Sequence, residues 1–283
     1  MSTTLPDPAL ASKYLKIADG RDKALKIVQY GFKVLLWAEI ITKTSHPTAH
    51  PRISAVVSQF SLTRRVLRLG HVVEPYSELR DVVDAGWSGT VGKKGASPLD
   101  RLAAVLGWIN PIASVVNDIV DDTICLAKIG AIDKSWSKKL DATSTNLWFA
   151  TILIDLFENA RGQRKLAADV ARRRRDVAAF SGVASKSHAA SSAVNYPSPA
   201  TSPTPVAGPD ATALARSTAV AALAAAKQKL WMQRVSFTKL VADMCFCWID
   251  FRKHEGRGAD GVQAVAGFCA ALLATYKIYV KCL

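Results

Sequence analysis

The polar side chains between Gly20 and Leu36 recur at the spacing of one face of an α-helix. With successive residues placed about 100° apart, they share roughly a third of the circumference, and apolar residues such as Phe32 cover most of the rest. The polar arc consists of Asp22, Lys23, Lys26, Gln29 and Lys33. Ammonium groups beside a wide apolar face suit a helix that lies in an anionic lipid headgroup layer. A surface helix of a soluble bundle has the same periodicity, so this segment alone leaves both interpretations open.

Residues 53–73 predict a second amphipathic helix, with a cluster of arginines on its polar face. Phe60 and Leu67 mark its apolar face. Its basic face carries Arg64, Arg65 and Arg68. Pro75 is expected to end this helix. We therefore expect both helices, with the lysines of the first and the arginines of the second, to bind a membrane surface.

Two acidic residues interrupt apolar stretches later in the chain. Asp155 lies within residues 143–160, and Asp243 lies within residues 235–251. An acid in an apolar membrane segment usually faces either a partner or a water-filled cavity. One interpretation is therefore a pore for small solutes, and the other is an ion pair with Lys239 or with a loop arginine.

The remaining reactive residue types show no catalytic or metal-binding spacing. The sequence contains no P-loop, no G-x-G-x-x-G and no H-E-x-x-H motif, and its five histidines are scattered. The five cysteines include a C-x-C but no C-x-x-C, so we interpret them as buried thiols in a reducing compartment. We expect no enzymatic activity, no cofactor and no metal.

Composition favours a membrane partner over nucleic acid. The 283 residues include 37 Lys and Arg against 23 Asp and Glu, a net charge of +14, which implies an anionic partner. Apolar residues make up 49% of the chain and the mean hydropathy is +0.12, which is high for so basic a protein. Abundant Ala, Leu and Val indicate helices. The predicted fold is an all-α, membrane-associated helical bundle with N-terminal amphipathic helices and short hydrophobic membrane helices.

Four apolar stretches are candidates for those membrane helices. They cover residues 102–117, 143–160, 235–251 and 261–276, and each is shorter than a typical span or contains an acid. If all four cross, the basic segments collect on one side, which satisfies the positive-inside tendency and places both termini in the cytosol. Buried helices of a soluble bundle are the alternative. A proline at position 111 is expected to kink the first stretch.

A polybasic run and a Ser/Ala/Pro-rich insert divide the chain. Residues 161–175 hold seven basic residues and one acid, and residues 181–212 are expected to be disordered or extended. A Gly/Ser loop at 84–98 separates the N-terminal part from the rest. We therefore expect four segments: amphipathic helices in 1–98, a hydrophobic helix pair in 99–160, the basic run and insert in 161–212, and C-terminal hydrophobic helices with a membrane anchor in 213–283.

Two elements near the N-terminus resemble the peroxin-11 family of peroxisomal membrane proteins. The first element matches at Gly20, Arg21, Asp22, Lys23, Gln29 and Tyr30. The second element matches at Ser61, Leu62, Arg64, Arg65, Arg68, Leu69 and Gly70. Residues 122–133 are similar to a third family segment, with Cys125 and Leu126 near its usual tryptophan, and the insert at 181–212 departs from the compact family pattern.

The resemblance implies a protein of the peroxisomal (or glycosomal) membrane that promotes peroxisome elongation, proliferation and fission. It implies insertion of the helix that carries Phe60 and Arg64, self-association into a homo-oligomer, and contact with dynamin-like fission machinery and with the peroxisomal membrane-protein import receptor. Anionic lipids are the expected ligand, and no nucleic acid is expected. A peroxisomal pore for small metabolites is the alternative that this resemblance leaves open.

Overall fold

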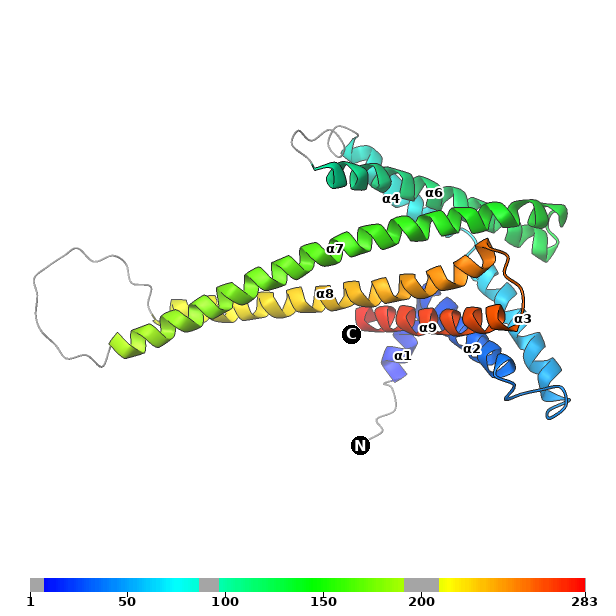
Figure 1. Cartoon of the computed structure of the whole chain (residues 1–283), viewed down its shortest axis with the longest axis horizontal. Helices are drawn as coiled ribbons and strands as arrows, with labels where there is room; N and C mark the ends of the chain where they lie inside the picture. Colours follow the sequence, from blue (N-terminus) through cyan, green and yellow to red (C-terminus); the bar gives the residue numbers. More distant parts are fainter. Residues whose placement is uncertain (1–7, 87–96, 191–208, 283) are drawn as a thin grey trace, which may run out of the picture. The chain divides into compact units, whose positions relative to one another are not determined.

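The computed structural model describes residues 8–86, 97–190 and 209–282, and within them every regular element is an α-helix (Figure 1). The helices are α1 (Pro8–Lys16), α2 (Ala18–Trp37), α3 (Ala49–Leu67), α4 (Val73–Ala85), α6 (Pro98–Ile129), α7 (Ser135–Ala190), α8 (Pro209–Phe251) and α9 (Arg257–Cys282). The prediction of an all-α, membrane-associated bundle is confirmed.

The chain forms two compact units. The larger contains residues 1–159 and 235–283, and the smaller contains residues 160–234. In the smaller unit, the parts of α7 and α8 that belong to it pack around Val170, Ala226 and Leu230. These units divide the chain differently from the four predicted segments, because α7 and α8 each contribute to both units.

In the larger unit, α2 and α9 form a closely packed antiparallel pair. The Tyr14 hydroxyl of α1 lies 3.2 Å from the Thr275 hydroxyl of α9, and the Trp37 indole N–H of α2 donates to the Arg257 carbonyl at 2.9 Å. Small residues on α9 allow this approach, since a side chain at Gly267 would collide with the Tyr30 ring. α9 therefore runs alongside α1 and the C-terminal half of α2.

The second amphipathic helix ends earlier than its periodicity predicts. α3 stops at Leu67, and Gly70 has φ 79°, a left-handed conformation that favours glycine. Pro75 does not end this helix but lies in the first turn of α4, where a missing backbone N–H costs no hydrogen bond. Arg68 consequently caps α3 and does not extend its basic face.

The prediction that residues 181–212 are disordered or extended is wrong at both ends of this insert. α7 continues to Ala190 and α8 begins at Pro209, so residues 181–190 and 209–212 are helical. Alanine is frequent in the helical ends of this insert and has the highest helix propensity. Residues 191–208 lie outside the described residues, as do residues 87–96 of the predicted Gly/Ser loop.

Within the described residues, two helices are long and apolar enough to cross a membrane, α6 and α9. They contain the first and the last of the four predicted apolar stretches, and α6 continues through Pro111 without interruption. Only 11% of the most apolar part of α6 is buried, whereas a core helix would be mostly buried. The predicted stretches in α7 (residues 143–160) and α8 (residues 235–251) are not apolar enough to count as candidate spans. A layout with four membrane crossings therefore stays a prediction.

Candidate functional site: a buried charge network and exposed apolar faces

The polar arc of α2 faces the protein interior. Asp22 and Gln29 are each 2% exposed, whereas Val28 on the apolar arc is 42% exposed. The only large apolar side chain of α2 that is buried is Tyr30. This arrangement differs from the sequence-based expectation, in which the polar arc faces lipid headgroups.

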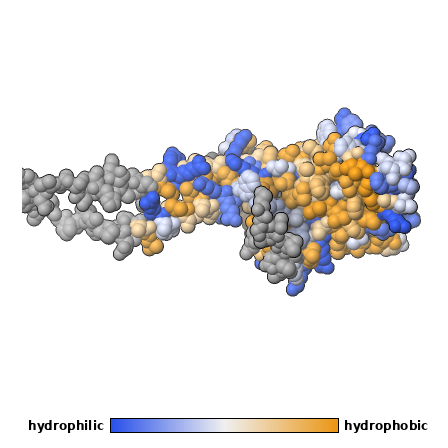
Figure 2. Space-filling model, turned by 90° about the horizontal axis from the view of Figure 1, so that it is seen from below, coloured by the Kyte–Doolittle hydropathy of each residue, from blue (hydrophilic) through white to orange (hydrophobic). Residues whose placement is uncertain are grey.

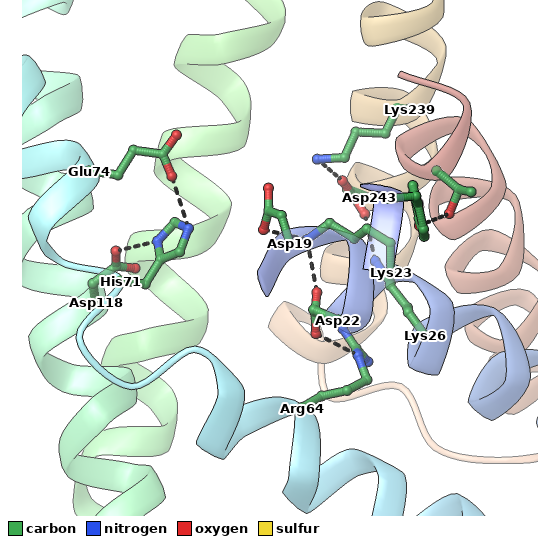
Figure 3. A network of polar contacts seen from close by, with 12 residues as sticks. Asp19, Asp22, Lys23, Lys26, Arg64, His71, Glu74, Asp118, Lys239 and Asp243 are labelled. Carbon is green, nitrogen blue, oxygen red and sulfur yellow. Dashed lines mark hydrogen bonds and ion pairs between the residues drawn. The ribbon is translucent and has the colours of Figure 1, made fainter. Parts of the chain in front are cut away.

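Arg64 of α3 binds the polar arc of α2 in a buried network of charged and polar side chains (Figure 3). Its Nε donates to Asp22 Oδ1 at 2.9 Å, and its Nη1 donates to Gln29 Oε1 at 2.8 Å. Lys23 donates to the other Asp22 oxygen at 2.8 Å and lies 3.6 Å from Asp19. Because charged groups lose hydration on burial, these partners are what makes the burial tolerable.

Asp243 of α8 forms ion pairs with a second set of residues in this network. Lys26 Nζ lies 3.5 Å from Asp243 Oδ1, and Lys239 Nζ lies 2.8 Å from Asp243 Oδ2. Two ammonium groups from different helices thus share one buried carboxylate (Figure 3). Lys33 lies over the Tyr30 ring, 4.9 Å from its centroid, in a cation–π contact.

The other predicted membrane-binding residues lie nearer the surface. Phe32, Phe60, Arg65 and Leu67 are half-buried, and Arg68 is exposed. The three arginines that the sequence groups on one face therefore have different surroundings. Arg64 is committed to Asp22, while Arg65 and Arg68 remain closer to the solvent-facing side.

The turn between α3 and α4 brings apolar side chains to the surface beside these arginines. We call residues 66–76 the α3–α4 corner; its exposed apolar residues are Val66, Leu69, Val73 and Tyr76, whose exposure ranges from 37% to 69%. Exposed large side chains in this number within a short segment indicate an interaction surface.

Two polar contacts fasten the corner to α6. His71 Nδ1 lies 3.1 Å from Asp118 Oδ2 and its Nε2 lies 3.0 Å from Glu74 Oε2, while the Gly70 N–H donates to Asp122 Oδ2 at 3.0 Å. The hydrogen bond with Asp118 raises the pKa of His71 above its ordinary value, against the opposing effect of partial burial. The Asp118 and Glu74 carboxylates act in the same direction as the hydrogen bond.

Asp155 has a partner from a neighbouring helix. The Asn110 amide of α6 donates to Asp155 Oδ1 at 2.7 Å. Asp243 pairs with Lys239, as one sequence interpretation anticipated, and also with Lys26. Sequence spacing indicates the Lys239 pair, four residues away on the same helix, but it contains no signal for the links from Arg64 to Asp22 or from His71 to Asp118, which join different helices.

Comparison with known proteins identifies the family. Residues 9–279 match the family model described as Peroxisomal biogenesis factor 11 (PEX11). The chain belongs to the PEX11 family. No curated protein and no solved structure matches it.

Membership of the PEX11 family confirms the resemblance seen in the two N-terminal elements. PEX11-family proteins are peroxisome biogenesis factors, which makes this chain a peroxisomal membrane protein involved in peroxisome proliferation. The PEX11 family is not a known enzyme family. The exposed apolar faces of α6 and α9 agree with a place in a membrane.

Proposed function

We propose that this protein promotes peroxisome elongation and fission by inserting its α3–α4 corner into one leaflet of the peroxisomal membrane. The observation that carries the proposal is the exposure of Val66, Leu69, Val73 and Tyr76 beside Arg65 and Arg68. An apolar wedge with basic neighbours fits the boundary between acyl chains and anionic headgroups.

The magnitudes assign most of the binding to the apolar side chains. Full burial of a large apolar side chain is worth about 1.5–3 kcal/mol, so four partly exposed ones contribute several kcal/mol together. An arginine near an anionic surface contributes about 1 kcal/mol, weakened by salt. The arginines therefore orient the corner and select anionic lipid, while the apolar residues hold it in place.

Insertion into one leaflet expands the area of that leaflet and favours positive curvature. One wedge bends a bilayer very little, so many copies must act together, and self-association into a homo-oligomer is part of the proposal. Contacts with dynamin-like fission machinery and with the import receptor are implied by the family and belong to the proposal as well.

The test is tubulation of vesicles by the reconstituted full chain. Arg65→Glu with Arg68→Glu should abolish tubulation of vesicles that contain anionic lipid, as seen by electron microscopy. Arg174→Glu with Arg175→Glu, two exposed arginines of α7, changes the net charge equally and is the matched control. Arg64 is left unchanged because its replacement would break the buried pair with Asp22.

Normal tubulation by the Arg65/Arg68 variant would show that the corner is a packing element. Equal loss in the control variant would show that net charge alone matters, and the corner would lose its assigned role. Unchanged circular dichroism of each variant is required before either result is interpreted.

A pore for small metabolites is the alternative that rests on Asp155 and Asp243. Each carboxylate has a partner within the chain, Asn110 for the first and Lys26 with Lys239 for the second, which favours a structural role for both acids. Solute flux through protein-containing vesicles separates the two functions. Flux that is lost in Asp155→Ala while tubulation persists would make transport the primary function.

A further inference from the structure

We propose that α2 crosses the peroxisomal membrane beside α9, with its apolar arc against lipid acyl chains and its charged arc buried against α3 and α8. The inference rests on membership of a family of peroxisomal membrane proteins and not on insertion of the α3–α4 corner. Its tests therefore fail or succeed independently of the tubulation experiment.

The polarity of α2 is the reverse of that of a surface helix in water. Such a helix buries its apolar stripe and exposes its polar one. In α2 the buried residues are Gly20, Asp22, Gln29 and Tyr30, and the aliphatic residues are all at least partly exposed. A helix whose charged residues face the protein and whose apolar residues face outward is favourable when the surroundings of the protein are apolar, as in a lipid bilayer.

Every charged side chain in the middle of α2 has a partner that would shield it from lipid. Asp22 is shared by Arg64 and Lys23, and Lys26 is paired with Asp243. Lys33 lies over the Tyr30 ring. In a bilayer, intramembrane charges are found paired or facing the interior of a bundle, as they are here.

The length of α2 matches the membrane, and its pairing places it at the depth of α9. Its 20 residues span about 30 Å at 1.5 Å per residue, the thickness of a hydrocarbon core. α9 has 26 residues and is, with α6, one of the two described helices apolar enough to cross by composition alone. α2 does not meet that measure, so its crossing depends on the partners that cover its charged arc. Because Tyr30 and Trp37 of α2 pack against Gly267 and Gly261 of α9, a membrane that surrounds α9 reaches α2 as well.

The outer side of α9 extends the apolar surface of α2. Its exposed large apolar residues follow one another at intervals of three, four or seven positions, and they are Val262, Val265, Leu272, Tyr276 and Tyr279. This spacing places them on one face, opposite the buried small residues that contact α2. Figure 2, seen from below, shows a broad hydrophobic surface on the larger unit with hydrophilic residues mainly at its margins.

The two ends of the pair carry the side chains that membrane boundaries select. Lys13, Lys16, Arg21 and Lys281 are exposed at the end where α1 and the last turn of α9 meet, and Lys13 bonds the Cys282 carbonyl. Their charge complements anionic headgroups, and the positive-inside tendency assigns this end to the cytosol. Trp37, a residue type enriched at membrane interfaces, lies at the other end.

A spin label on the apolar arc measures the surroundings of α2 directly. Val28→Cys places a nitroxide near the middle of α2, and Val220→Cys in the smaller unit is the matched control, since the two valines are 42% and 47% exposed. The full chain, with its own five cysteines replaced by alanine, is reconstituted into vesicles that contain anionic lipid. If that chain does not fold, only the exposed Cys245 and Cys269 are replaced.

The label at position 28 should collide more often with oxygen than with a water-soluble nickel chelate, and the label at 220 should show the opposite preference. The depth at position 28 should be about 15 Å, the middle of the hydrocarbon core. A depth of about 5–10 Å would assign α2 to the interface and overturn the proposal, as would equal nickel access at both positions.

Labelling of intact peroxisomes tests the crossing itself. Ser12→Cys and Thr44→Cys introduce exposed thiols before and after α2. A membrane-impermeant maleimide should modify position 12 at once and position 44 only after the membrane is permeabilised. Modification of both positions in intact organelles would show that α2 does not cross.

Discussion

Replacement of Arg64 by methionine should destabilise the folded chain strongly. Arg64 is 8% exposed and Asp22 is 2% exposed, so the pair lies out of water. The substitution keeps the aliphatic volume but removes two charge-assisted hydrogen bonds, to Asp22 and to Gln29. Leaving one member of a buried ion pair without its partner costs about 3–5 kcal/mol. Because Lys23 still contacts Asp22, we expect the lower end, about 3 kcal/mol.

The measurement is unfolding of the detergent-solubilised full chain by titration with SDS, followed by circular dichroism. Asp22→Leu combined with Arg64→Met removes both charges together and should recover most of the loss, to within about 1 kcal/mol of the parent chain. Arg65→Met, at the adjacent half-buried position, is the matched control and should cost less than about 1 kcal/mol.

Equal effects of Arg64→Met and Arg65→Met would refute the reasoning. That result would mean that Arg64 is solvated like its neighbour and that the polar arc of α2 faces water or headgroups. A double variant that is less stable than Arg64→Met alone would also refute it, because the cost would then come from lost packing and not from an unpaired carboxylate.

Two further predictions concern helix packing and pH. Gly267→Leu should cost about 3 kcal/mol in the same SDS titration because the new side chain collides with an aromatic ring of α2, whereas Gly258→Leu on the same helix meets nothing within 4 Å and should be close to neutral. The raised pKa of His71 means that its link to Asp118 stabilises the fold fully below about pH 6.5 and is lost as pH rises through the folded-state pKa. The chain should therefore lose up to about 1 kcal/mol between about pH 6 and pH 8, and His71→Gln should remove this dependence while His254→Gln, at an exposed position, retains it. A glycine pair with equal effects, or a pH profile unchanged in His71→Gln, would contradict these assignments.

The helical class and the extent of α2 follow from the sequence because they depend on local periodicity. The polar arc from Asp22 to Lys33 is a property of residues within a few turns of one another, and α2 covers the predicted segment with about one turn added at its ends. The end of α3 was less predictable. Gly70 and Pro75 are both helix-ending residue types, and only the folded chain shows that the glycine ends α3 while the proline begins α4.

Which way an amphipathic helix faces does not follow from its periodicity. The arc that contains Lys26 is equally consistent with headgroups outside and with carboxylates inside. The deciding partner, Asp243, is 217 residues away in the chain (243 − 26), and no local rule connects the two positions. Arg64 illustrates the same limit, since its neighbours Arg65 and Arg68 share its apparent face in sequence but not its buried partner.

The pairing of α2 with α9 also sets an order of events during synthesis. The Trp37–Arg257 contact joins residues 220 positions apart, which a ribosome translating about 5–20 residues per second needs roughly 10–45 s to make. For most of that interval Lys26 has no access to Asp243 and Tyr30 has no contact with Gly267 of α9, while α1 and α3 already provide the partners of Gly20 and Asp22. A nascent chain of this design therefore carries Lys26 without its carboxylate partner until translation reaches α8, and the packing of α2 is completed only after α9 has been made.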